Sequence, residues 1–165
     1  MVPPVTLRSP VPSDADALAS LHVRCWHEAY GALLPDDFFT EEVLESRRRL
    51  WTRLCAAPQP GRTVRVAEAG GELVGFSAGG TPLDPSDGAL GQELSSLYLL
   101  QDFHGSGAGQ ALFDAVLMDG PAFLWVAARN PRAQAFYRRN GFTPDGATDT
   151  DAHFGGMEEL RMTRS

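Results

Sequence analysis

The chain reads LYLLQDFHGSGAGQAL from Leu97 to Leu112, and this stretch decides which folds and ligands the sequence can accommodate. It begins as an apolar strand, continues through a loop with glycines at 105, 107 and 109, and ends in a segment with helical apolar spacing. Glycines let a backbone approach a ligand closely, and the unpaired N–H groups at the start of a helix carry the positive end of its dipole. The stretch therefore predicts a strand, a tight loop and a helix that together bind a pyrophosphate.

Three phosphate-containing ligands compete for this loop, and the absence of lysine helps to separate them. All 14 basic side chains are arginine, which excludes an ordinary P-loop and any Schiff base on lysine. Arg129 would suit the phosphate of NADP. A dinucleotide-binding fold, however, needs a second set of parallel strands, and the 56 residues that follow Gly109 are too few to form it. Coenzyme A is the third candidate, and a turn that serves only helix–strand packing is the structural alternative.

Hydrophobic periodicity and turn residues divide the chain into strands and helices. Ser13 and Asp16 resemble a capping box, Asn130-Pro131 provide an N-cap and a first-turn proline, and Asn140-Gly141 provide a glycine stop. We expect strands at 5–8, 62–68, 73–79, 93–100 and 123–127, helices at 14–30, 37–57, 108–118 and 131–140, and one or two final strands that include 157–162. This order predicts one mixed α/β domain over residues 1–165.

Composition and charge exclude several classes of protein. With 165 residues, the chain has the length of a single domain. Its net charge of −7 disfavours nucleic acid and anionic membranes as partners. Cys25 and Cys55 lie far apart without a CxxC motif, which predicts neither a disulfide framework nor a metal site. No apolar run approaches the ~20 residues of a membrane helix, and the N-terminus lacks signal-peptide features, so we expect a cytoplasmic protein.

A rival enzyme class is indicated by Gly75-Phe76-Ser77-Ala78-Gly79, which spells the nucleophile elbow of serine hydrolases. That motif requires Ser77 to stand between a strand and a helix. The residues that follow include Pro82 and Pro85 and cannot begin a helix of any length. The competing interpretation is a strand with glycines where backbones approach closely.

A second block of residues extends the pattern of the glycine loop. Asn130, Ala133, Tyr137, Gly141 and Phe142 follow it in the spacing N-x(2)-A-x(3)-Y-x(3)-G-F. Together with the loop and with the first strand and helix, this block resembles the GNAT N-acetyltransferase superfamily over nearly the whole chain. The resemblance implies one domain with a central, mostly antiparallel sheet, a splayed strand pair and flanking helices. It places acceptor-side helices at about 13–57 and an acyl-CoA-binding half at about 91–142.

The resemblance also implies which residues contact acetyl-CoA, the expected co-substrate. The backbone amide of Leu99 would face the thioester carbonyl. His104 stands where relatives often have Gln or Arg, and no basic residue occurs in the loop, so the phosphates would depend more on backbone amides. The implied cofactor-binding residues are Leu99, His104, Gly105, Ser106, Gly107, Ala108, Gly109, Gln110 and Asn130.

Two residues are implied to move protons. Tyr137 matches the tyrosine that often donates to the leaving thiolate, although a phenol pKa near 10 and a thiol pKa near 8.5 make full transfer uphill unless the site shifts them. Glu93 opens a predicted strand and shares strand parity with Leu97 and Leu99; it would accept the amine proton through water. The alternatives are a packed aromatic residue for Tyr137 and a solvated strand-end carboxylate for Glu93.

The acceptor side is implied by Trp26-His27-Glu28-Ala29-Tyr30, which resembles a Trp-x-x-x-Tyr stretch of small-molecule acetyltransferases. Trp26 and Tyr30 would stack on an amine with Glu28 as counter-charge, or the two rings are core aromatics. The implied reaction transfers acetyl to a primary amine of a small molecule (polyamine-, aminoglycoside- or amino-acid-like) or a peptide, and the acidic charge suits a cationic acceptor. A non-catalytic CoA-binding regulator is the alternative, and a homodimer is expected by analogy only.

Overall fold

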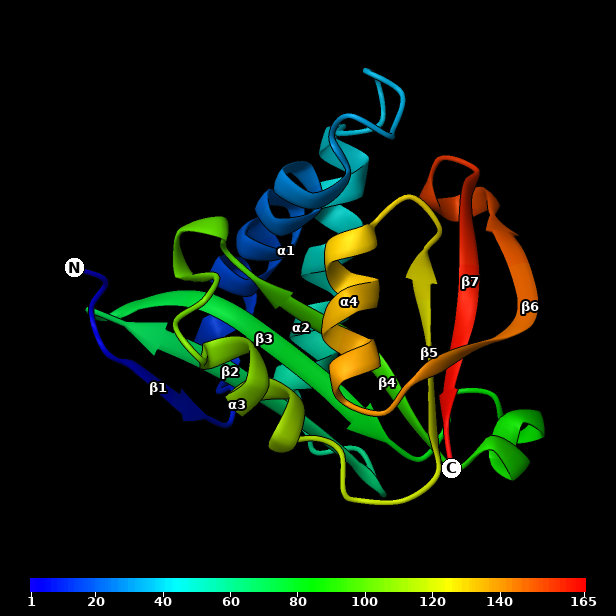
Figure 1. Cartoon of the computed structure of the whole chain (residues 1–165). Helices are drawn as coiled ribbons and strands as arrows, with labels where there is room; N and C mark the ends of the chain where they lie inside the picture. The colour runs from blue at the N-terminus through cyan, green and yellow to red at the C-terminus, as the bar shows by residue number, and fades with distance from the viewer.

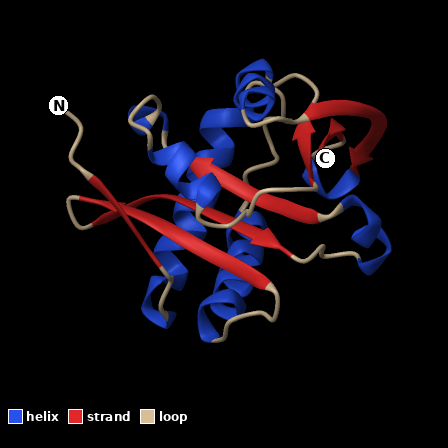
Figure 2. Cartoon of the chain, turned by 60° about the horizontal axis from the view of Figure 1, so that its bottom comes forward, coloured by secondary structure: helices blue, strands red, loops and turns tan.

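The computed structural model describes residues 1–165 and has one seven-stranded sheet in the order β1-β2-β3-β4-β5-β7-β6. Helices α1 and α2 cover one face of the sheet and α3 and α4 cover the other (Figures 1 and 2). All neighbouring strands are antiparallel except β4 and β5, which confirms the predicted fold class. The strands are β1 (Val5–Arg8), β2 (Arg62–Ala69), β3 (Glu72–Gly80), β4 (Gln92–Leu99), β5 (Ala122–Ala127), β6 (Thr143–Asp151) and β7 (Met157–Arg164), and the helices are α1 (Ala15–Tyr30), α2 (Glu41–Ala56), α3 (Ala108–Asp114) and α4 (Pro131–Arg139).

Two helices are shorter than the sequence predicts. Helix α2 begins at Glu41 and not near residue 37, because the side chain of Thr40 accepts a hydrogen bond from Val43 N and caps the first turn. Helix α3 ends at Asp114 and not at Met118, because the amide of Val116 bonds to the carbonyl of Phe113 three residues earlier, which tightens and closes the helix. Both differences lie at helix ends, where apolar periodicity carries little information.

The parallel strands β4 and β5 separate after only three paired positions. Gln92, Glu93 and Leu94 pair with 122–124, and beyond Leu94 the two strands diverge. Leu94 and Ser96 oppose the adjacent residues Gly79 and Ala78 of β3, so Ser95 is the extra residue of a β-bulge. The bulge turns β4 away from β5, while β5 remains paired with β7. The predicted splay is therefore present, and its position is set at Ser95.

Side chains from two elements hold the Ser95 bulge in place. The Ser95 hydroxyl accepts a hydrogen bond from the Arg62 guanidinium of β2 and donates one to the carbonyl of Ala78 at 3.2 Å. Arg62 also approaches the Glu93 carboxylate, with 3.8 Å between the charged atoms. The bulge is thus anchored on both the second and third strands of the sheet.

The Gly-x-Ser-x-Gly motif is a packing feature of β3. Ser77 is completely buried, and its hydroxyl donates to the carbonyl of Leu112 in α3 at 2.8 Å. A Cβ on Gly75 would stand 2.8 Å from the Tyr98 carbonyl oxygen, so the glycine permits close contact with β4 and α3. The strand continues through the motif to Gly80 and no helix follows. The serine-hydrolase alternative is therefore wrong, because a buried hydroxyl inside a strand cannot attack a substrate.

No helix in the chain has both the length and the apolar character needed to cross a bilayer.

Substitution of Gly75 by alanine tests this close packing. The added methyl group would contact the backbone oxygen of Tyr98 and the Leu99 side chain inside normal van der Waals distance. We expect Gly75→Ala to lower the free energy of unfolding by about 1–3 kcal/mol, as overpacking does in well-packed interiors. Urea denaturation monitored by circular dichroism measures the change.

Gly88→Ala is the matched control, because a Cβ at Gly88 meets no atom within 4 Å. Its free energy of unfolding is expected to stay within about 0.5 kcal/mol of the native value. Equal stability of the two variants would contradict the close approach of β3, β4 and α3.

Candidate active site

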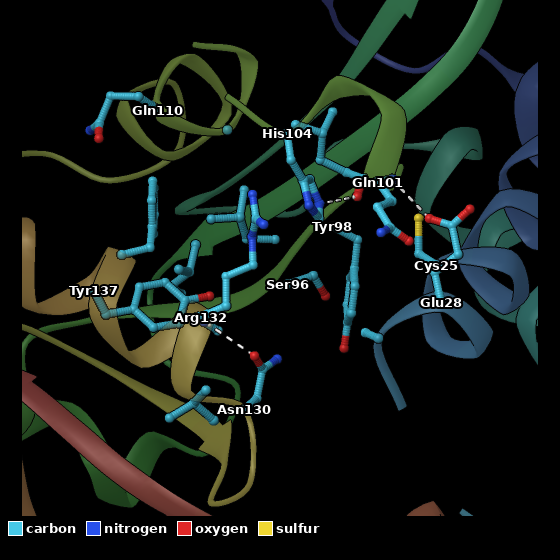
Figure 3. A pocket seen from close by; sticks show the side chains of 18 of the residues that line it. Cys25, Glu28, Ser96, Tyr98, Gln101, His104, Gln110, Asn130, Arg132 and Tyr137 are labelled. Carbon is cyan, nitrogen blue, oxygen red and sulfur yellow. Dashed lines mark hydrogen bonds between the residues drawn. The ribbon is translucent and has the colours of Figure 1, made fainter. Parts of the chain in front are cut away.

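The divergence of β4 and β5 opens a cavity of about 620 Å³ that is lined from both faces of the sheet. Residues of α1 contribute one wall, and the glycine loop, α3 and α4 contribute the other (Figure 3). Ten of the predicted site residues line this cavity: Glu28, Tyr30, Leu99, His104, Gly105, Gly107, Gly109, Gln110, Asn130 and Tyr137. Trp26, Glu93, Ser106 and Ala108 do not.

The glycine loop presents free backbone donors to the cavity. Gly105 and Gly107 adopt left-handed φ values of 80° and 88°, which only glycine accepts readily. This conformation leaves the amides of Gly107, Gly109 and Gln110 without an intramolecular acceptor. The Ser106 hydroxyl is occupied differently: it donates to the Phe103 carbonyl at 2.7 Å and accepts from the Ala108 amide at 3.3 Å. Three converging free N–H groups suit an anionic diphosphate.

Positive charge reaches the cavity from α4 and not from the loop. Arg132 and Arg139 line the cavity, and neither forms an ion pair. With Phe136 they lie at positions i, i+4 and i+7, so they occupy one face of the helix. Neither arginine was predicted from the sequence, although this helical spacing relative to Tyr137 could have indicated them. They compensate for the absence of a basic residue in the glycine loop.

The backbone of Leu99 faces the space where β4 and β5 part. The amide of Leu100 bonds to the carbonyl of Val74 in β3, and backbone groups alternate in direction along an antiparallel strand. The N–H and C=O of Leu99 therefore point away from β3, towards the cavity. His104 Nε2 lies 2.9 Å from the Leu99 carbonyl oxygen, which is consistent with this direction. A carbonyl bound here would receive a hydrogen bond from Leu99 N–H, in the manner of an oxyanion site.

All three tyrosines of the chain line this one cavity. The side chain of Tyr137 is buried, and its hydroxyl points towards the middle of the cavity (Figure 3). Burial and the nearby Tyr30 raise the pKa of Tyr137, so its hydroxyl is protonated at neutral pH. Burial also raises the pKa of Tyr30, while the neighbouring side chains of Tyr98 and Asn130 oppose that rise. Tyr98, which was not predicted as a site residue, lies on the opposite side of β4 from Leu97 and Leu99.

Glu93 is placed away from the cavity, and the prediction that it accepts the amine proton is not supported. Its carboxylate accepts a hydrogen bond from the Leu83 amide at 2.6 Å and interacts with Arg62. The predicted parity between Glu93 and Leu97 assumed a regular strand. The bulge at Ser95 inserts one residue between them and changes which side of the sheet each side chain faces.

The predicted acceptor-binding residues of α1 have other contacts. Trp26 packs among His22, Phe154 and the Arg47 guanidinium, with ring or charge centres 4.6, 4.5 and 4.9 Å away. The Tyr30 ring is buried with its edge against Phe154, so it is not a free stacking surface. The interpretation of both rings as core aromatics fits these contacts.

Glu28 lines the cavity, but its carboxylate already has hydrogen-bond partners within the protein. Its carboxylate accepts hydrogen bonds from the Gln101 amide at 2.8 Å and from Arg24 at 3.3 Å (Figure 3). The first of these bonds joins α1 to the start of the glycine loop. We interpret Glu28 as a residue that positions the loop relative to the acceptor-side helices.

The comparisons with known proteins agree with this geometry. Residues 60–144 match the family model described as an acetyltransferase (GNAT) domain. An uncharacterized N-acetyltransferase of Mycobacterium tuberculosis is 32% identical to this chain, and the match covers 81% of this chain and 86% of the relative. An uncharacterized N-acetyltransferase of Bacillus subtilis is 26% identical, and the match covers 93% of this chain and 87% of the relative. One similar structure is the PaiA N-acetyltransferase from Thermoplasma acidophilum in complex with coenzyme A, with 21% identity, a TM-score of 0.68 and coverage of 98% of this chain and 99% of that chain. Another is an acetyltransferase from Thermus thermophilus, with 28% identity, a TM-score of 0.64 and coverage of 99% of both chains.

The chain therefore belongs to the GNAT family of acetyltransferases, which confirms the resemblance drawn from its motifs. It is an acyltransferase whose co-substrate is acetyl-CoA and whose acceptor is an amine. The free amides of the glycine loop and the two cavity arginines fit the phosphates of this co-substrate. No three His, Cys, Asp or Glu side chains lie close enough together to hold a metal ion.

Gly107→Ala tests the role of the loop conformation. Alanine at a φ of 88° costs about 1–2 kcal/mol, and relief of that strain would turn the free amides away from the cavity. We expect the Kd of coenzyme A to rise at least about tenfold, as measured by isothermal titration calorimetry. Gly146→Ala is a matched control, because Gly146 has a φ of 92° in β6 and equally open surroundings. Comparable losses of CoA affinity in the two variants would contradict the assignment of the loop.

Proposed function

We propose that this protein transfers the acetyl group of acetyl-CoA by direct attack of a primary amine, with Tyr137 as the proton donor to the leaving thiolate. The observation that carries the proposal is the convergence of two groups on one cavity: the Leu99 N–H from β4 and the Tyr137 hydroxyl from α4. The first suits the oxygen of a thioester carbonyl and the second suits its sulfur. Both lie beside the free amides of the glycine loop.

Each step of an acyl transfer has a group in the cavity. Acetyl-CoA supplies an activated acyl group, and the loop amides with Arg132 and Arg139 would hold its phosphates. When an amine attacks the carbonyl carbon, negative charge develops on the carbonyl oxygen, and Leu99 N–H would stabilise it. As the C–S bond breaks, the protonated Tyr137 would donate to the sulfur. Because burial raises the pKa of Tyr137 further above that of a thiol, the transfer is uphill unless the amine nitrogen returns a proton to Tyr137 in the same step.

Cys25 also lines the cavity, and its state supports direct attack over a covalent acetyl-cysteine intermediate. Burial raises the pKa of its thiol to about 12. At neutral pH the thiol is therefore almost entirely protonated, and the thiolate is the nucleophilic form of cysteine. The acetyl group would pass from coenzyme A to the amine in one transfer.

The acceptor that we propose is a small polyamine-, aminoglycoside- or amino-acid-like molecule or a peptide. The net charge of −7 favours a cationic acceptor. Three acidic side chains near the acceptor side of the sheet, Asp149, Asp151 and Glu159, add local negative charge. A CoA-binding regulator without activity is the second candidate, but it would need neither the Leu99 amide nor Tyr137 in its cavity.

Thiol release from acetyl-CoA in the presence of polyamines, aminoglycosides, amino acids or peptides tests the proposal. We expect turnover with at least one amine, and Tyr137→Phe should lower kcat by about 10²-fold, because a general acid contributes at least that much. Its Kd for coenzyme A should stay within about twofold of the native value, since Tyr137 binds no phosphate in this scheme.

Ser77→Ala serves as the control and should retain native kcat, because Ser77 is buried beneath α3. Tight CoA binding without turnover of any amine would favour the regulator, and full activity of Tyr137→Phe would remove the assigned proton donor.

A further inference from the structure

The side chain of His104 makes a contact inside the cavity that stands where the co-substrate has to pass. Its ring nitrogen Nε2 lies 2.9 Å from the carbonyl oxygen of Leu99, and both residues line the cavity (Figure 3). Because a carbonyl oxygen can only accept a hydrogen bond, Nε2 carries a proton and donates it. The imidazole therefore occupies the backbone acceptor that Leu99 directs into the gap between β4 and β5.

The two ends of the co-substrate are placed on either side of this contact. The thioester is proposed to bind at the N–H of Leu99, and the phosphates at the free amides of Gly107, Gly109 and Gln110. The pantetheine arm joins the sulfur to the phosphates, so it must run from Leu99 past the end of β4 to the glycine loop. The carbonyl of a residue follows its N–H along the chain, so the Leu99 carbonyl lies on the loop side. The imidazole of His104 therefore lies across the route of the arm.

The pantetheine arm can take over the bond that His104 makes. The arm contains two amide groups, and an extended chain beside free backbone groups of a strand pairs with them as an added strand does. An amide N–H of the arm would donate to the Leu99 carbonyl, which in the free protein accepts from His104 Nε2. One donor replaces the other, so the carbonyl keeps a partner when the co-substrate enters.

The side chain of His104 is free to leave. It is exposed, and its bond to Leu99 is the one hydrogen bond that it makes. The loop around it is open, because a Cβ placed on Gly105 or Gly107 would meet no atom within 4 Å. The imidazole can therefore turn into solvent without displacing packed groups, at the cost of a single hydrogen bond.

We propose that His104 forms an autoinhibitory contact: in the free protein its imidazole closes the path of the pantetheine arm, and acetyl-CoA binds only after the ring has left the Leu99 carbonyl. The closed fraction of the protein then raises the apparent Kd of the co-substrate. This role is opposite to the one expected from the position of His104 in the motif, which was that of a residue that holds the co-substrate. The inference rests on the proposed placement of the thioester at Leu99.

The affinity of His104→Ala for coenzyme A tests the direction of the effect. We expect its Kd, measured by isothermal titration calorimetry, to be about three- to tenfold lower than the native value, because one hydrogen bond favours the closed state by a factor of this size. Loss of an imidazole that holds the anionic ligand would instead raise the Kd. An unchanged or higher Kd would overturn the inference.

His104→Gln is the matched variant. The amide nitrogen of glutamine can stand where Nε2 stands and donate to the same carbonyl, so we expect the Kd of coenzyme A to stay within about twofold of the native value. A Kd as low as that of His104→Ala would show that the donor to Leu99 is irrelevant, and would contradict the proposal.

ADP separates the arm from the phosphates, since it contains a diphosphate and no pantetheine. It should bind the amides of the glycine loop without meeting the imidazole, so its Kd should be the same in the native protein and in His104→Ala. If the substitution tightens ADP as much as coenzyme A, it acts on the loop as a whole and the inference is wrong.

Nuclear magnetic resonance follows the ring directly. In protein labelled with nitrogen-15 at histidine, the ring signals lost in His104→Ala identify His104. We expect coenzyme A to move these signals towards those of a solvent-exposed histidine such as His153, and we expect ADP to leave them in place. Ring signals of His104 that do not change on addition of coenzyme A would overturn the inference, including where ADP binds too weakly for calorimetry.

These measurements need no acceptor, so their failure is distinct from failure of the proposed function. A native protein that binds coenzyme A but acetylates no amine contradicts the proposed function and leaves the contact of His104 to be judged on binding alone. A native protein that binds no coenzyme A contradicts both.

Discussion

The structure depends on the β-bulge at Ser95, which forces two parallel strands apart after three paired residues. Parallel strands inside a sheet normally satisfy each other's backbone groups. Here the bulge withdraws β4 from β5 and leaves the Leu99 N–H directed into the cavity, while the Leu99 carbonyl oxygen lies 2.9 Å from His104 Nε2. Arg62 and the Ala78 carbonyl hold the bulge through the Ser95 hydroxyl. One inserted residue therefore creates both the cavity and its most important backbone donor.

The other elements of the site are arranged around this gap. Helix α4 follows β5 and brings Tyr137 to one side, and the glycine loop follows β4 and brings free amides to the same side. Helix α1 packs on the other face, where the rings of Tyr30 and Tyr98 lie 6.4 Å apart. A donor bound on one face and an acceptor bound on the other would meet where the strands part, which explains how a small domain can accommodate two substrates.

Much of this arrangement could be predicted from local sequence patterns. The glycine loop and the Asn130 cap have strong turn and capping chemistry, so the elements around them followed from local spacing, and the place of Tyr137 in the site was implied by the family resemblance. The position of Glu93 relative to the cavity could not be inferred from the sequence, because a bulge at Ser95 reverses strand parity and leaves no clear mark in the residue pattern. Tyr98 was also missed, since its proximity to the cavity comes from strand register between distant segments. Arg132 and Arg139 were missed although their spacing relative to Tyr137 on α4 could have indicated them.

The gap between β4 and β5 is the place where the thioester of acetyl-CoA is expected to bind, against the amide of Leu99. Amide NMR spectra of protein labelled with nitrogen-15, recorded with acetyl-CoA and with coenzyme A, test this binding mode most directly. Both ligands should shift the amides of Gly107, Gly109 and Gln110, and only the acetyl group should change the Leu99 resonance further. Identical Leu99 resonances with the two ligands, or shifts confined to residues outside the cavity, would contradict it.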